Sequence, residues 1–250
     1  MPVISVITPV HAPAAQYLEA AYRSLADQAL PDGWSWEWIV QQDGDDYDLS
    51  TALPADSRAK FSTGRRGGPG VARTLALSRA TGSLVKVLDA DDVLTPGALS
   101  RDIEALTQNP EIGWTTSRVL DLLPNGETKG FDDDPPAGRL SRGSVHRHWL
   151  ANSWRAQVHP ATLCIRYELL LALGGWMALP ASEDTGLLLA ADAVQSGYFI
   201  AETGLLYRKW DGQSTANVAH VDETERTARM HVIHERALAL RQVLSSSSAA

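Results

Sequence analysis

Residues 3–10, VISVITPV, are β-branched and apolar almost throughout. Such a run is typical of a strand that is buried on both faces of a parallel sheet. Residues 14–29 follow, with Leu18, Ala21, Tyr22 and Leu25 at helical spacing. Since neighbouring parallel strands need a long crossover connection, usually a helix, this order favours an α/β fold.

The same alternation continues to about residue 110. Further strands are predicted over 36–44 and 83–92, with a short strand at 60–63. One helix is predicted over 71–82, with Gly82 as its stop, and another from an N-cap at Thr95-Pro96 to about Thr107. This order predicts a mostly parallel, doubly wound sheet with right-handed crossovers.

The second half is less regular. Residues 111–145 are turn-rich and indicate strands joined by an exposed loop around Asp132-Asp133-Asp134. Beyond them the sequence predicts a strand and helix over 161–176 and a helix over roughly 183–196. A strand over 204–210 and an amphipathic helix over 221–243 complete the prediction, before a disordered tail, SSSSAA, at 245–250.

Composition limits the function classes. The 250 residues carry a net charge of −8, which argues against a nucleic-acid-polymer binder because such proteins need a basic face. The single Cys164 excludes an internal disulfide and a Cys-rich zinc site, and fits a reducing, cytoplasmic setting. The sequence shows neither a signal peptide nor a stretch long enough to span a bilayer, so we expect a soluble protein.

Polar or turn-forming residues stand at the carboxyl ends of three predicted strands: Pro9, Asp43 and the cluster Asp89, Asp91 and Asp92. Ligands of doubly wound sheets bind beyond these strand ends. Burying three carboxylates together is costly unless a cation offsets their charge, and Mg²⁺ or Mn²⁺ prefers such oxygen ligands. The alternative is that these aspartates form an Asx-turn or cap the next helix, which suits Asp92 best.

Four motifs occur in one order: SVITPVH at 5–11, QDG at 42–44, GPGVARTLALSRATGSLVKVLDADDVLTPGAL at 68–99 and ASEDTGLLL at 181–189. Together they resemble the family 2 glycosyltransferases over roughly residues 3–215. The resemblance implies a GT-A fold and inverting transfer of a sugar from a nucleotide-diphosphate donor to an acceptor hydroxyl. It implies a nucleotide-sugar-binding half at 1–110, an acceptor-binding and catalytic half of the same domain at 111–220, and a C-terminal helix at 221–244.

The resemblance also implies donor-side roles. Thr8, Pro9 and Val10 lie where the base and ribose of the donor bind, and Asp43 accepts a hydrogen bond from the base. Asp89 and Asp91 match the family's D-x-D pair: Asp91 binds the Mg²⁺ or Mn²⁺ that bridges the diphosphate, and Asp89 supports either the ribose or the metal. Arg66, or its neighbour Arg65, is a weaker candidate for a donor contact, with a solvated loop as the alternative. Arg73 either contacts the donor or anchors its helix.

Catalytic and acceptor-side roles follow from the same resemblance. Asp184 matches the catalytic base; its alternative is an acid favoured at a helix N-terminus. Trp176, Glu183 and His159 are the candidates for acceptor contacts, with core packing as the alternative for Trp176 and a structural role as that for His159.

One position departs from the family pattern. Many metal-dependent relatives have a His in the late strand-loop that touches the ion or diphosphate. Trp210 stands at about that position here, within YRKWDGQST, and Arg208, Lys209 or Gln213 are candidates to compensate.

Other functions stay open at this stage. A catalytically silent nucleotide-sugar-binding protein is one, and a metal-dependent nucleotidyltransferase is a lesser one, since VITPVHAPAAQ lacks a Gly-rich triphosphate loop. The acceptor is a small molecule, a glycan or a lipid-linked molecule. The last helix either closes the domain or forms a homodimer.

Overall fold

The computed structural model describes residues 1–45, 47–49, 52–213 and 222–247. Its strands are β1 (Val3–Val10), β2 (Ser35–Gln42), β3 (Ala59–Ser62), β4 (Leu84–Val87), β5 (Val93–Leu94), β6 (Ile112–Leu122), β7 (Thr128–Lys129), β8 (Gly138–Leu140), β9 (Cys164–Arg166) and β10 (Ser196–Arg208). Its α-helices are α1 (Leu18–Ala26), α2 (Pro69–Ala76), α3 (Ala98–Gln108), α4 (Ser144–Ala151), α5 (Tyr167–Ala172), α6 (Glu183–Val194) and α8 (Glu223–Ser247). Its 3-10 turns are η1 (Ala12–Tyr17), η2 (Leu77–Arg79) and η3 (Pro160–Thr162).

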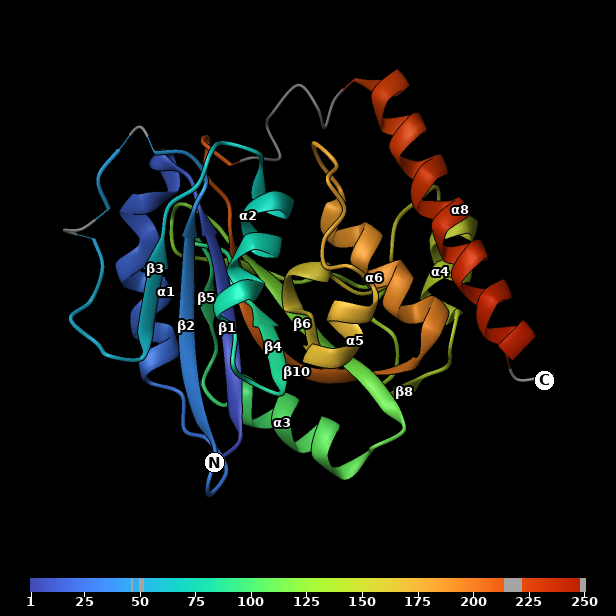
Figure 1. Cartoon of the computed structure of the whole chain (residues 1–250), viewed down its shortest axis with the longest axis horizontal. Coiled ribbons are helices and arrows are strands. Elements are labelled where there is room, and N and C mark those ends of the chain that lie inside the picture. The colour runs from blue at the N-terminus through green and yellow to red at the C-terminus, as the bar shows by residue number, and fades with distance from the viewer. Residues whose placement is uncertain (46, 50–51, 214–221, 248–250) are drawn as a thin grey trace.

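The strands form one ten-stranded sheet in the order β3-β2-β1-β4-β9-β6-β10-β5, with β7 paired to β6 and β8 to β10 (Figure 1). Strands β1 to β4 pair in parallel, as the sequence predicts. Strand β9 then enters between β4 and β6 and is antiparallel to both. The sheet is therefore mostly parallel, as predicted, and it continues through both predicted halves of the chain.

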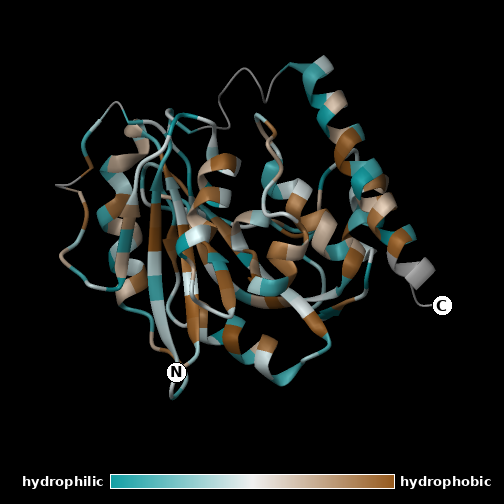
Figure 2. Cartoon of the chain, viewed as in Figure 1, coloured by the Kyte–Doolittle hydropathy of each residue, from teal (hydrophilic) through white to brown (hydrophobic). Residues whose placement is uncertain are grey.

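Apolar cores cover both faces of this sheet. Along β1, Val6 faces a core shared with α1 and α3, whereas Ile7 faces a core shared with α2, α5 and α6. Since successive side chains of a strand point to opposite faces, a strand between two cores must be apolar at almost every position. Figure 2 shows apolar residues concentrated along the central strands.

Four predicted boundaries are wrong. The strand predicted over 204–210 is the end of the longer strand β10, which begins at Ser196. The 71–82 helix ends earlier, at η2, and Gly82 does not stop it; a Cβ on Gly82 would lie 2.6 Å from the Val3 carbonyl oxygen, so Gly82 allows close approach to β1. The 83–92 strand stops at Val87. Helix α3 is capped by Gly97 in the left-handed region rather than by Thr95. Thr95 instead donates its hydroxyl to the Thr203 carbonyl.

The C-terminal helix packs as predicted. Met230, Ile233 and Ala237 of α8 are buried, and Leu240 is partly buried against the same core. The helix crosses α6 and lies beside α4 (Figure 1). Its end differs from the prediction, because 245–247 belong to the helix instead of a disordered tail. Residues 248–250 lie outside the described residues.

A buried ion pair ties four elements together. Lys86 of β4 donates to Asp102 of α3 and to the Thr162 carbonyl of η3, both at 2.7 Å. Asp102 also accepts from Thr115 of β6 at 2.6 Å. Both charged side chains are 1% exposed. This network fixes the turn η3, which follows His159.

Replacing Lys86 by Met leaves the Asp102 carboxylate buried without its charge partner. We expect a loss of about 3–5 kcal/mol in the free energy of unfolding, measured by urea denaturation. The double variant Lys86→Met/Asp102→Leu should recover most of this loss, since an apolar pair needs no counter-charge. Equal stability of the single variant and the parent protein would contradict this account.

The contact between α8 and α4 predicts a pH dependence. His146 Nε2 lies 2.9 Å from His234 Nδ1, and burial together with the charges of Arg241, His234 and Arg147 lowers the pKa of His146 to about 4. The folded state therefore keeps His146 neutral between pH 4 and 6.5, where the unfolded chain binds a proton.

Stability should consequently fall as the pH drops from about 6.5 towards 4, by on the order of 2 kcal/mol from this group. The measurement is urea denaturation across that range, for the parent protein and His146→Phe, which keeps a ring beside Trp149. The difference in stability between the two proteins should shift in favour of the variant at low pH. A difference that stays constant with pH would contradict the role of His146.

Candidate active site

The carboxyl ends of β1, β2 and β4 meet at one edge of the sheet. Val10 pairs with Gln42, and the Asp43 amide donates to the Val10 carbonyl at 2.8 Å. Beyond β4, the Leu88 amide donates to the Ile7 carbonyl. This arrangement brings Asp43 and the segment 89–92 to the same edge, where ligands of doubly wound sheets bind.

The loop before α2 donates hydrogen bonds to the Asp43 carboxylate. Asp43 accepts from the amides of Gly67 at 2.6 Å and Gly68 at 3.1 Å, and it is 9% exposed. The interaction holds the Gly-rich loop against the end of β2. Arg66, in that loop, is exposed. The roles predicted for Asp43 and Arg66 in donor binding stay predictions.

The residues Thr8, Pro9 and Val10 are all buried. The Thr8 hydroxyl donates to the Leu88 carbonyl at 2.6 Å and accepts from the Trp38 indole at 2.8 Å. Its side chain therefore links β1 to β2 and to Leu88, directly before the 89–92 segment. The donor-binding role predicted for Thr8, Pro9 and Val10 stays a prediction.

Each aspartate of the 89–92 segment has a different partner. Asp89 accepts from Arg73 Nη2 at 2.6 Å, Asp91 accepts from the Trp210 indole at 2.6 Å, and Asp92 accepts from the Arg208 amide at 2.9 Å. Asp92 is fully buried, and its amide closes a turn onto the Asp89 carbonyl. This placement agrees with the structural role expected of Asp92.

Burial and mutual repulsion act on these carboxylates. Burial, and then the charge of Asp89, raise the pKa of Asp91. Burial, Asp89 and Asp91 raise the pKa of Asp92 well above its usual value. Asp92 Oδ2 is buried without a hydrogen-bond partner among the described residues. The segment therefore holds negative charge that a cation at this edge would stabilise.

Arg73 of α2 joins this segment to the start of α6. Its Nη2 binds Asp89 at 2.6 Å and its Nη1 binds Glu183 at 2.7 Å, while its side chain is 4% exposed. Burial alone would lower the pKa of Arg73, but Asp89, Glu183 and Asp184 raise it above its usual value. Arg73 is thus a buried cation that joins the 89–92 segment to Glu183, which lies 110 residues after Arg73 in the chain.

Gly70 makes this approach possible. A Cβ at this position would lie 2.7 Å from the Glu183 Cγ and 2.9 Å from the Met177 carbonyl oxygen. Helix α2 therefore approaches α6 this closely only with glycine here. The GPG sequence at 68–70 serves helix packing, in addition to the loop that contacts Asp43.

Glu183 and Asp184 begin helix α6 but differ in exposure. The Glu183 side chain is 6% exposed and faces Arg73, and burial and Asp184 raise its pKa despite that contact. Asp184 is half-buried and accepts from the Thr185 amide at 2.6 Å. Glu183 is therefore held in an ion pair, whereas Asp184 keeps access to solvent; the predicted acceptor contact of Glu183 stays a prediction.

Trp176 does not line the site. It is 4% exposed, packs in the core on the α2–α6 face of the sheet, and lies 6.0 Å from the Arg73 guanidinium. The prediction that it stacks on a sugar is wrong, and its core-packing alternative is correct. After Gly174-Gly175 the chain turns inward, and the Trp176 amide donates a hydrogen bond to the Thr74 hydroxyl of α2.

Tyr207 is a site residue that sequence reasoning missed. Burial raises the pKa of its hydroxyl, and so do the charges of four carboxylates, those of Asp92, Asp89, Asp184 and Asp91. Its ring centroid lies 4.9 Å from that of His159. The charges of the 89–92 segment and of Asp184 thus act on Tyr207, which also packs against the core shared with α1 and α3. In the sequence, an aromatic residue near the end of a strand is indistinguishable from a core residue.

His159 and Lys209 complete this side of the site. Burial lowers the pKa of His159, although Asp184, Asp121 and Asp89 act in the opposite direction. Lys209 Nζ lies 4.3 Å from the Tyr207 ring and 3.2 Å from Asp121. His159 accepts from the Ala161 amide at 3.3 Å, so it also begins the turn η3.

The Trp210 side chain is hydrogen-bonded to Asp91. The indole N–H donates to Asp91 Oδ2, and the ring packs edge-on against Tyr17 at 5.1 Å. An indole can only donate, so Trp210 cannot replace a His as a metal ligand. The residues expected to compensate have other partners: Arg208 binds the Asp91 carbonyl, Lys209 binds Asp121 and Gln213 binds the Arg208 carbonyl.

The carboxylates of Asp89 and Asp91 suit a cation whose remaining ligands come from the substrate. Among the described ranges, which omit 214–221, no three His, Cys, Asp or Glu side chains gather as a metal site. Mg²⁺, however, is usually held by one or two carboxylates together with substrate phosphates and water. Asp89 and Asp91, with the repulsion between them, fit that mode.

Comparison with known proteins identifies the family. The model described as Glycosyl transferase family 2 matches residues 5–151. The O-antigen biosynthesis protein RfbC of Myxococcus xanthus is 26% identical over 182 residues, which cover 70% of this chain and 13% of that protein. An uncharacterized glycosyltransferase of Haemophilus influenzae is 31% identical over 114 residues, 44% of each chain.

Among solved structures, TarS 1-349 of S. aureus in complex with UDP-GlcNAc has a TM-score of 0.66 at 19% identity, covering 87% of this chain and 61% of that chain. The longer TarS structure has a TM-score of 0.63 at 18% identity, covering 97% and 43%. These likenesses show the fold. The chain spans less than half the length of the curated relatives named above. None of the described helices is both long and apolar enough to cross a membrane.

The family model covers more than half of the chain and includes the 89–92 segment. The predicted resemblance is thereby confirmed: the protein belongs to glycosyl transferase family 2.

Proposed function

We propose that the protein transfers a sugar from a nucleotide-diphosphate donor to an acceptor hydroxyl, with inversion at the anomeric carbon. The observation that carries this proposal is the position of Arg73, which binds Asp89 at 2.6 Å and Glu183, the neighbour of Asp184, at 2.7 Å. Two motifs that are distant in the sequence therefore meet at one site. The structures of TarS with UDP and UDP-GlcNAc support a nucleotide-sugar donor.

Asp184 acts as the general base in this proposal. It takes the proton from the acceptor hydroxyl as the hydroxyl oxygen attacks the anomeric carbon and the nucleoside diphosphate leaves. A single displacement needs no second carboxylate as nucleophile. The Glu183–Arg73 ion pair keeps the side chain next to Asp184 fixed, and the Thr185 amide orients the Asp184 carboxylate.

Asp89 and Asp91 would hold Mg²⁺ or Mn²⁺, with Asp91 as the main ligand. When bound there, the ion would neutralise the charge that develops on the leaving diphosphate. Tyr207, whose raised pKa keeps its hydroxyl protonated, would donate a hydrogen bond to the diphosphate or the donor sugar. Asp43 would contact the base, which leaves uracil, thymine and guanine as alternatives.

The metal role predicts a specific change in nucleotide affinity. UDP should bind at least about tenfold more tightly with Mn²⁺ than with EDTA, because the ion links the diphosphate to Asp91. In Asp91→Ala that difference should disappear. Isothermal titration calorimetry measures both affinities. Asp45→Ala, an exposed aspartate in the loop after β2, is the control. Equal affinity with Mn²⁺ and with EDTA in the parent protein would contradict the metal role.

A further inference from the structure

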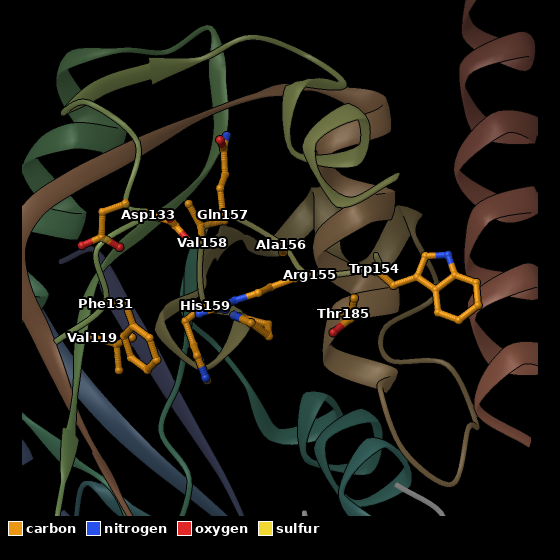
Figure 3. Close-up of a pocket in the computed structure, with 12 residues that line it drawn as sticks. Val119, Phe131, Asp133, Trp154, Arg155, Ala156, Gln157, Val158, His159 and Thr185 are labelled. Atoms are coloured by element: carbon orange, nitrogen blue, oxygen red, sulfur yellow. The ribbon is translucent and has the colours of Figure 1, made fainter. Parts of the chain in front are cut away.

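A cavity of about 250 Å³ lies beside the start of α6 (Figure 3). Its walls come from three parts of the chain: Val119 and the segment 131–134, the segment 154–160, and Thr185. Ligand pockets usually measure 300–1,000 Å³, so this cavity suits one ring-sized group rather than an oligosaccharide.

The cavity adjoins the proposed base. Thr185, in its wall, directly follows Asp184 and donates to it through both its amide and its hydroxyl. His159, in the same wall, lies within the electrostatic influence of Asp184 and Asp89 and packs on Tyr207. A molecule in the cavity therefore contacts Thr185, the residue that adjoins the carboxylate that would accept its proton.

The charges around the cavity cancel. Asp134 is paired with Arg118 at 2.8 Å, which leaves Asp133 and Arg155 as the remaining charged groups of the wall. Figure 3 shows the Arg155 side chain directed into the cavity towards His159. An anionic ligand near Arg155 would also meet Asp133 and Asp134. A neutral ligand with both donors and acceptors fits better, because guanidinium, carboxylate and hydroxyl groups are all available.

One wall is apolar. Figure 3 shows the Phe131 ring and the Val119 side chain close together, opposite Thr185. A pyranose ring has this dual character, with C–H groups on its faces and hydroxyls at its edge. An aromatic ring beside polar groups suits such a ligand, because the ring covers the C–H face while the polar groups bind the hydroxyls.

The backbone before Arg155 is strained. Ser153 and Trp154 have φ values of 51° and 67°, and a bulky non-glycine residue in this region is a genuine outlier. Such residues cost on the order of 1–3 kcal/mol each and cluster at binding sites. The Trp154 ring is clamped between Trp149 and Arg226 of α8, which maintains the conformation and turns Arg155 towards the cavity.

From these observations we infer that the cavity is an acceptor subsite that binds one neutral sugar ring, with Arg155 and Asp133 binding its hydroxyls and Phe131 covering its face. The inference rests on the proposed function for the identity of the acceptor hydroxyl. The binding itself is independent of turnover and can be tested without a known donor.

The test is saturation-transfer NMR on the full chain with methyl β-glucopyranoside, methyl β-galactopyranoside and methyl α-mannopyranoside. Glucose 6-phosphate and glucuronate are the anionic comparisons. At least one neutral glycoside should bind with a millimolar dissociation constant, about fivefold or more tighter than either anion. Arg155→Met and Asp133→Asn should each weaken that binding about fivefold, the loss expected for one hydrogen bond.

Arg142→Met removes an exposed arginine that does not line the cavity, and it should leave the binding unchanged. Thermal melts of all variants should match that of the parent protein, since Arg155 and Asp133 are both exposed. The inference is overturned if no neutral glycoside binds, if either anion binds more tightly, or if neither cavity variant weakens binding. None of these outcomes would alter donor turnover, which tests the proposed function separately.

Discussion

Replacing Asp184 by Asn should reduce sugar transfer by about 10²–10⁴-fold while the dissociation constant of the nucleotide donor changes little. The amide keeps the size and shape of the carboxylate but cannot take the proton of an acceptor hydroxyl. Asp184 is half-buried at the first turn of α6 and is positioned by the Thr185 amide, so the substitution removes a function without opening a cavity. Steady-state kinetics and calorimetric titration of the donor separate the two effects.

Asp32→Asn makes the same chemical change in an exposed turn before β2 and should leave both quantities unchanged. The alternative role of Asp184, stabilising the N-terminus of α6 by the helix dipole, makes a different prediction. In that case Asp184→Asn would lower stability by about 0.3–1 kcal/mol and keep near-parental turnover. Near-parental turnover would therefore remove Asp184 as the base.

Replacing Arg73 by Met should lower the free energy of unfolding by about 3–5 kcal/mol, because Asp89 and Glu183 then lose their shared cation. The Glu183 side chain is 6% exposed and that of Asp89 24%, so water compensates only partly. The variant should also transfer sugar poorly, since the 89–92 segment and the start of α6 lose their direct link. Urea denaturation and kinetics measure the two effects.

Two comparisons test whether loss of the ion pairs causes the lower stability of Arg73→Met. Arg73→Lys should recover part of the stability, because an ammonium can reach one carboxylate but not bind both as the guanidinium does. The deficit of Arg73→Met should also shrink as the pH falls, because the folded-state pKa of a buried, unpaired Glu183 is raised and protonation relieves it. Arg101→Met, in α3, is the matched control. A deficit that does not vary with pH would contradict this explanation.

The sequence predicts the donor half well for a physical reason. Strands that pack on both faces must be apolar at nearly every position, and VISVITPV satisfies this requirement without reference to distant residues. The convergence of Asp43 and the 89–92 segment follows from parallel pairing alone. The antiparallel insertion of β9 depends on pairing with β4 and β6, which no local pattern of a three-residue strand can predict.

Errors at the site have a similar cause. Trp176 and Tyr207 look alike in the sequence, yet Trp176 is buried in the core, whereas Tyr207 is partly buried and the charges of the 89–92 segment and Asp184 act on it. Their surroundings come from segments distant in the sequence, so composition and spacing cannot separate them. The sequence alone does not decide whether Arg73 contacts the donor or anchors its helix, because its partners, Asp89 and Glu183, are brought together only by the close approach that Gly70 allows.

The most direct test of the proposed function is release of nucleoside diphosphate from a panel of UDP-, dTDP- and GDP-sugars with Mn²⁺. The proposal predicts slow release from at least one donor by the parent protein, a loss of that release with EDTA, and its loss in Asp184→Asn. Binding of a donor without any release, or equal release by the parent protein and Asp184→Asn, would contradict it.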